Sequence, residues 1–202
     1  MKTPLRYQMT EYDCVPTTFM NAVSYLFDRE EIPPELVRSI MIYCLDTHGH
    51  NGHCGEDGTS RMAIHFLSSW MNEFGKSRQV PVKAVYLEGE EVYVGEKGQI
   101  NAALEEGGVA LVRLYHMKTG HYVLFTKDLG DRVQIFDPYL YELTPEFSDW
   151  EKIEAIKDAP FSCNYIMPYE LFNRETKENY ALGEMDKREA VLLFKEDTVL
   201  FE

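Results

Sequence analysis

The sequence lacks any run of about 20 apolar residues, the length that a membrane-spanning helix needs,. Its first residues, MKTPLRYQMTEYDC, contain no apolar stretch of the kind found in secretory signal peptides,. Internal repeats, low-complexity segments and linker-like stretches are missing as well. We therefore predict one domain over residues 1–202, located in the cytoplasm and without a membrane partner.

Basic residues are scarce, with 20 Lys and Arg against 34 Asp and Glu, so the formal net charge is -14. Nucleic-acid binding needs a basic face to contact phosphates, and anionic membrane surfaces attract basic segments. The acidic balance therefore excludes both as main partners. The composition leaves the oligomeric state unknown.

Cysteine is also sparse, with four thiols scattered at Cys14, Cys44, Cys54 and Cys163. Because no export signal is visible, we expect these thiols to stay reduced rather than to form disulfides. Cys44 and Cys163 lie in apolar surroundings and are predicted to be buried.

A loop with the sequence THGHNGHCG carries three histidines and a cysteine, at His48, His50, His53 and Cys54. Imidazole and thiolate are good zinc ligands, but this spacing fits no established zinc pattern and lacks a second distant pair. We therefore favour solvated loop histidines, and we predict no metal and no cofactor. Metal sensing by this loop, or a place for it at the rim of a cleft, stay open as alternatives.

Apolar periodicity divides the chain into helices first and strands afterwards, which predicts an α+β fold. A Pro at the first turn and a Gly at the end mark several boundaries. The predicted helices are 15–27, 34–45, 60–74 (ended by Gly75), 99–106 and 150–157. The predicted strands are 80–87, 109–117, two strands joined by a turn at 129–131, 161–167 and 190–195.

The segment YQMTEYDCVPTTF places Cys14 where a polar loop turns into an apolar helix. The positive end of the helix dipole favours a thiolate, which is the nucleophilic form of cysteine. Asp13 is a plausible N-cap for the same helix. The alternative is that Cys14 is simply buried as a small hydrophobic residue.

A base for such a thiol is offered by His121, at the start of the strand GHYVLF, and a carboxylate by Asp137, at the end of the strand VQIFDP. A hairpin that turns at 129–131 pairs positions whose numbers sum to about 260, so these two residues should face each other across it. A carboxylate on one ring nitrogen fixes the tautomer and leaves the other nitrogen for a thiol. His116 could rival His121 but has no carboxylate opposite it. A histidine–aspartate hydrogen bond without catalysis is the alternative.

Gln8, Asp13 and Cys14, followed by GHYVLF and IFDP, resemble the motifs of papain-like cysteine peptidases. They are most similar to the bacteriocin-processing branch that cleaves double-glycine leaders, family thirty-nine of the cysteine peptidases. The resemblance implies a papain-like fold with N-terminal helices packed on a mostly antiparallel sheet. It also implies that Cys14 is the nucleophile, His121 the general base and acid, and Asp137 the residue that orients His121. Gln8 and the backbone N–H of Cys14 would then hold the oxyanion.

The family usually has Gly after the cysteine, where this chain has Val15 and Pro16. By the resemblance, Asp13, Val15 and the segment Gly58, Thr59 and Ser60 would contact the substrate. Ser60 is equally suited to be a helix N-cap. The implied function is hydrolysis of a peptide or another amide bond. An acyl-transferring or amide-forming enzyme, and a catalytically silent peptide-binding module, are the alternatives.

Overall fold

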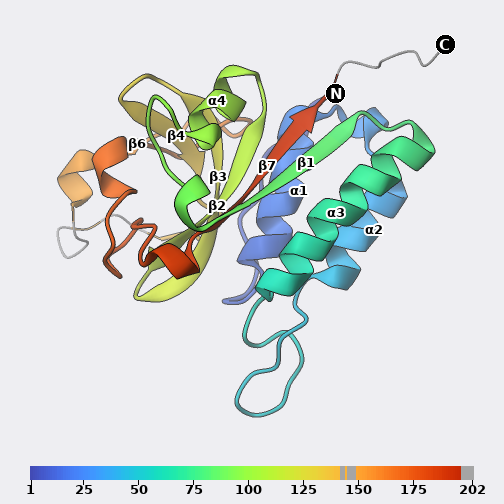
Figure 1. The fold of residues 1–202 in the computed structure, drawn as a ribbon, viewed down its shortest axis with the longest axis horizontal. Coiled ribbons are helices and arrows are strands. Elements are labelled where there is room, and N and C mark those ends of the chain that lie inside the picture. Colours follow the sequence, from blue (N-terminus) through green and yellow to red (C-terminus); the bar gives the residue numbers. More distant parts are fainter. Residues whose placement is uncertain (142–143, 145–148, 197–202) are drawn as a thin grey trace.

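The three longest helices come before Gln79, and all the strands of the described residues come after it, in the computed structural model of this protein (Figure 1). The structure describes residues 1–141, 144 and 149–196. It has the α+β fold class that the order of elements predicts. None of the helices in these described ranges combines the length and apolarity that crossing a membrane would require.

The four α-helices found in the described residues are α1 Cys14–Leu26, α2 Pro34–Tyr43, α3 Arg61–Arg78 and α4 Gln99–Glu105. Proline lies in the first turn of two of them, as Pro16 in α1 and Pro34 in α2. There its missing N–H costs nothing, because the first amides of a helix have no intrahelical partner. The sequence therefore predicts where both helices begin.

The strands are β1 Val82–Glu88, β2 Val109–His116, β3 Thr119–Asp128, β4 Arg132–Phe136, β5 Glu154–Ala155, β6 Tyr165–Pro168 and β7 Glu189–Lys195. In the described part of the chain they form one antiparallel sheet of seven strands, in the order β1-β7-β2-β3-β4-β6-β5. The last strand in the sequence therefore lies between β1 and β2. This places the C-terminal strand next to the edge strand β1, with both of its sides paired.

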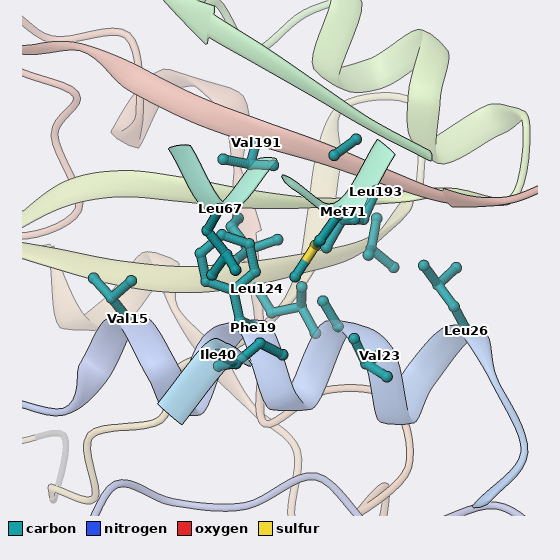
Figure 2. Packing of buried hydrophobic residues seen from close by; sticks show 14 of the residues in the cluster. Val15, Phe19, Val23, Leu26, Ile40, Leu67, Met71, Leu124, Val191 and Leu193 are labelled. Atoms are coloured by element: carbon teal, nitrogen blue, oxygen red, sulfur yellow. The ribbon is translucent and has the colours of Figure 1, made fainter. Parts of the chain in front are cut away.

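The helices α1, α2 and α3 pack on one face of this sheet. Figure 2 shows Val15, Phe19 and Val23 of α1 directed toward Leu124 of β3, with side chains of α2, α3 and β7 closing the same cluster. Burial of each such large apolar side chain contributes about 1.5–3 kcal/mol. The position of α1, and therefore of Cys14 at its start, is fixed by this core.

The other face of the sheet carries a second apolar cluster, to which α4 contributes Ile100 and Leu104. The C-terminal part of the chain adds Phe172 and Tyr180, which are fully buried in it. Both faces of the central strands are thus covered. This explains why β2 is buried at nearly every position instead of alternating,.

The β3–β4 hairpin has the predicted register. Leu124 pairs with Phe136 and Phe125 with Ile135, so the paired positions sum to 260. A bulge between Phe125 and Lys127 then shifts the pairing by one residue near the turn,. Because the bulge lies on the turn side, the open end of the hairpin keeps the predicted alignment.

Two predicted helix boundaries are wrong. The helix α3 does not end at Gly75 but continues to Arg78, with Gln79 in the left-handed conformation as its C-cap. Gly75 is instead a close-packing position, since a Cβ there would lie 2.7 Å from the carbonyl oxygen of Val82. The helix expected over 150–157 is only a single 3-10 turn, Trp150–Lys152, and β5 comes directly after it.

Candidate active site

Cys14 is the first residue of α1 and is 9% exposed. The hydroxyl oxygen of Thr18, one turn later, lies 2.7 Å from the carbonyl oxygen of Cys14 and 3.1 Å from that of Tyr122. This contact links the first turn of α1 to strand β3. The thiol is therefore held at the helix N-terminus, beside the strand that carries His121.

His121 and Asp137 lie together, as the hairpin register predicts. The Nε2 atom of His121 is 2.6 Å from Oδ1 of Asp137, and the carboxylate is fully buried. A hydrogen bond this short between a ring nitrogen and a carboxylate is charge-assisted. It leaves Nδ1 as the ring nitrogen that is available to a thiol.

The thiol of Cys14 is close enough to the ring of His121 to raise its pKa. Burial by itself lowers the pKa of His121, but the charge and hydrogen bond of Asp137, together with Cys14, outweigh it and raise this pKa to about 10. At neutral pH the ring is therefore an imidazolium. The geometry brings Cys14, His121 and Asp137 into one line of contacts.

Asp137 is held by groups that the sequence patterns did not indicate. Its Oδ2 accepts a hydrogen bond from the hydroxyl of Tyr180 at 2.8 Å, and its Oδ1 accepts one from the backbone N–H of Tyr139 at 2.9 Å. The side chain of Asn164 bonds both the backbone N–H and the backbone carbonyl of Asp137 at 2.8 Å. Tyr180 and Asn164 lie far along the chain, and no local spacing links them to this carboxylate.

His116 lies next to this group, with its ring centroid 5.4 Å from that of His121. Burial lowers its pKa below the ordinary value, so a neutral ring is favoured at this position,. The carboxylate of Asp137 hydrogen-bonds the ring of His121. This pairing makes His121 the better-equipped base of the two.

Gln8, the predicted oxyanion donor, lies beside the segment after β4, since its backbone N–H donates to the carbonyl of Pro138 at 2.8 Å. Its side-chain Nε2 donates to the carbonyl of Thr10 at 2.7 Å. One of the two amide hydrogens is thus used locally, and the second remains for another acceptor. The role of Gln8 at an oxyanion stays a prediction.

Asp13 is the N-cap residue of α1, as predicted, but its side chain makes no cap hydrogen bond. The carboxylate turns back and accepts hydrogen bonds from the backbone of Met9 and from both the backbone and the hydroxyl of Thr10. Burial would raise the pKa of Asp13, but these bonds lower it below the usual value. Asp13 therefore shapes the loop before Cys14, and its contact with substrate stays a prediction.

A pocket of about 730 Å³ opens beside Cys14, within the size range of small-molecule sites,. Its lining comes from the starts of α1 and α3, the loop before α3, the β2–β3 hairpin and the start of β7. The lining residues are Glu11, Tyr12, Cys14, Val15, Asp57, Gly58, Thr59, Arg61, Arg113, Thr119, Gly120, Tyr122, Asp186, Lys187 and Glu189.

Of the predicted substrate-binding residues, Val15, Gly58 and Thr59 border this pocket. Ser60 does not line it and acts as the N-cap of α3, where its hydroxyl accepts from the N–H of Ala63 at 3.1 Å. The capping alternative is thus the one that the structure supports for Ser60. No signal in the sequence had singled out the charged residues of the pocket.

Glu189 is the most deeply buried charge of the pocket, at 3% exposed. Its carboxylate accepts hydrogen bonds from the hydroxyls of Tyr86 and Tyr122 and pairs with Nε of Arg61 at 3.2 Å. Burial and Glu189 raise the pKa of Tyr122 well above its ordinary value. This hydroxyl therefore stays protonated and donates its hydrogen to the carboxylate.

The histidine-rich loop projects away from the helices between α2 and α3 (Figure 1). It closes on itself through a bridge between His48 and Cys54, and the ring of His53 contacts Glu56. Within the described ranges of the chain, no three His, Cys, Asp or Glu side chains gather as metal ligands would. The metal-sensing alternative gains no support from this arrangement.

A comparison with models of protein families and with curated proteins found no match to this chain.

Proposed function

We propose that this protein is a papain-like cysteine hydrolase that cleaves a peptide or another amide bond. The observation that carries the proposal is the line of contacts from Cys14 through His121 to the buried Asp137, with the thiol at a helix N-terminus. An activated cysteine needs a base and a group that orients the base, and these three residues have the required chemistry. The N-terminal helices against an antiparallel sheet support a papain-like arrangement.

In the proposed reaction the Cys14 thiolate attacks the carbonyl carbon of the substrate, forming a C–S bond and a tetrahedral oxyanion. The imidazolium of His121 gives its Nδ1 proton to the leaving nitrogen, the C–N bond breaks, and an amine departs from a thioester. Water then attacks the thioester while His121 takes one of its protons. The C–S bond breaks, a carboxylic acid leaves, and the starting pair is restored.

The oxyanion of this reaction needs hydrogen-bond donors at the start of α1. The backbone N–H of Cys14 has no intrahelical partner, because it is the first of the helix,. The free amide hydrogen of Gln8 would be the second donor. The presence of Val15 and Pro16 after the cysteine leaves both donors in place.

The direct test is to incubate the protein with a defined mixture of peptides and to identify new termini by mass spectrometry. Wild type should produce cleavages that Cys14→Ala abolishes. The matched control is Cys54→Ala, which removes an exposed loop thiol and should leave the cleavages unchanged.

Cleavage that persists in Cys14→Ala would refute the proposed nucleophile. If wild type instead binds peptides tightly but cuts none of them, the silent binding module becomes the better explanation.

A cytoplasmic location remains a prediction of the sequence, which fractionation of cells expressing the full chain would test.

A further inference from the structure

Arg113 differs from the other cations of the pocket in its partners. Arg61 pairs with Glu189 at 3.2 Å and Lys187 with Asp186 at 3.2 Å. In the part of the chain that the structure describes, no carboxylate lies within salt-bridge distance of the Arg113 guanidinium. Among the described residues, the pocket beside Cys14 therefore contains one positive charge that no carboxylate pairs.

This guanidinium is fixed in place by its surroundings. Its Cζ lies 5.0 Å from the ring centroid of Tyr115, and its Nη1 is 3.4 Å from the carbonyl oxygen of Lys187. It also lies over Gly120, where a Cβ would be 2.6 Å from Nη2. The absence of a side chain at Gly120 makes room for the charge, directly before His121.

The neighbouring buried carboxylate does not use this charge. Arg113 pairs with Tyr122 across β2 and β3, and Glu189 begins the strand on the other side of β2. Glu189 is already satisfied by Arg61, Tyr86 and Tyr122. The planar fork of Arg113 is thus left with donors that match the two oxygens of a carboxylate.

We propose that Arg113 binds a carboxylate of the substrate, so that the pocket beside Cys14 selects substrates with an acidic group close to the scissile bond. This inference rests on the proposed function. The formal net charge of -14 gives an anion no long-range attraction to the chain,. Recognition therefore depends on the local contact with Arg113.

The test compares three alkylating reagents on the full chain: iodoacetate, which carries a carboxylate, neutral iodoacetamide, and cationic 2-bromoethylamine. Mass spectrometry of the digested protein gives the rate at Cys14 and, in the same tube, at the exposed Cys54. The ratio of the iodoacetate rate to the iodoacetamide rate cancels the thiolate fraction of each cysteine. We expect this ratio to be about tenfold higher at Cys14 than at Cys54, the effect of one charge-assisted contact.

In Arg113→Gln the ratio at Cys14 should fall to that at Cys54. An unchanged ratio would overturn the proposal, and so would a preference of Cys14 for bromoethylamine, because Glu11 and Asp57 would then govern the pocket. The buried thiols Cys44 and Cys163 report folding, since they stay unlabelled only in a folded chain. If Cys44 and Cys163 are labelled in Arg113→Gln, the experiment is repeated with Arg113→Met, which keeps the aliphatic stem over Tyr115. The same fall in the ratio at Cys14 is expected.

Capped dipeptides then distinguish the two sources of a carboxylate. Acetyl-Glu-Gly-amide carries it on a side chain, acetyl-Gln-Gly carries it at the C-terminus, and acetyl-Gln-Gly-amide carries none. We expect one of the two acids to protect Cys14 from iodoacetamide in wild type but not in Arg113→Gln. Equal protection by the neutral peptide would overturn the proposal.

These measurements separate this inference from the proposed function, because alkylation needs no turnover. If the peptide mixture is not cleaved but the ratio at Cys14 depends on Arg113, the hydrolase is refuted and the anion site stands. If peptides are cleaved in a Cys14-dependent manner but the ratio is independent of Arg113, the anion site is refuted and the hydrolase stands.

Discussion

Two buried carboxylates lie near Cys14, and their partners differ in one respect. Asp137 accepts from Tyr180 and His121, whereas Glu189 accepts from Tyr86 and Tyr122 and pairs with Arg61. Both carboxylates receive hydrogen bonds from tyrosine hydroxyls. The cation of one is an imidazolium, which can lose its proton, and that of the other is a guanidinium, which cannot.

This difference between the two paired cations indicates different roles for the two carboxylates. In the proposed reaction, Asp137 acts on a group that can move a proton, and it would tune the acid–base chemistry at Cys14. Glu189 pairs with the permanently charged guanidinium of Arg61 and accepts from two tyrosine hydroxyls, so it fixes the positions of these side chains beside the pocket. Strand β3 serves both, because the adjacent residues His121 and Tyr122 leave a strand on opposite faces.

The largest effect that would test this comparison is on turnover. We expect Asp137→Asn to lower the rate of peptide cleavage by on the order of 10³–10⁴-fold, because the amide favours the wrong tautomer of the histidine. The matched change Glu189→Gln, at the other buried carboxylate, should lower it far less. Steady-state rates of the two variants on one substrate are the measurement, and similar losses in both would break the comparison.

The next largest effect is on the stability of the fold, and it concerns Glu189 rather than Asp137. Glu189→Ala leaves the hydroxyls of Tyr86 and Tyr122 and the Nε of Arg61 without the carboxylate that accepts from them, and we expect it to cost about 2–4 kcal/mol,. The cost is held down because the side chain of Arg61 is 40% exposed to solvent,. Urea unfolding gives the value, and Glu189→Gln, which keeps the acceptor oxygen, should lose less. Equal losses of stability in the two variants would show that the retained acceptor oxygen of Gln contributes nothing and that the whole cost comes from the lost charge.

A pH series isolates the proton of His121. The pKa of this residue is about 10 in the folded chain against 6.5 as the ordinary value, so the folded state holds a proton that the unfolded state releases. The contribution to stability is fully present below pH 6.5 and is lost as the pH rises through about 10,. The difference in unfolding free energy between wild type and His121→Gln should shrink across this window. Parallel curves would contradict the assigned proton.

The smallest effect concerns Tyr180. Removing its hydroxyl in Tyr180→Phe takes away one hydrogen bond to Asp137 and should cost about 1 kcal/mol of stability. If Tyr180 positions Asp137, the pKa of His121 should also change, which NMR titration of the ring detects. Tyr86→Phe, which removes a hydroxyl from Glu189, is the control and should leave that pKa unchanged. A change in both variants, or in neither, would remove the distinction between the two carboxylates.

Local patterns were sufficient to predict much of this arrangement. Proline in the first turn placed the start of α1, and the turn at 129–131 placed His121 near Asp137. Both depend on chain geometry over a few residues, which the sequence expresses directly. The order of helices before strands likewise predicted the α+β class.

Patterns failed where distant segments meet. Gly75 was interpreted as a helix end because its role depends on the backbone of Val82, which approaches it only in the folded chain. Tyr180 and Glu189 carried no signal, since they reach Asp137 and Tyr122 from far along the chain. These contacts depend on tertiary packing.

The sequence by itself determined the start of α1 to within one residue and which imidazole lies near which carboxylate, because short turns and helix starts are local. Only the tertiary structure decided that β7 enters between β1 and β2. That insertion brings Glu189 beside Arg113 and leaves the guanidinium over Gly120 without a carboxylate of its own among the described residues. Strand order in a sheet is set by the burial of both faces at once, and no local spacing records it.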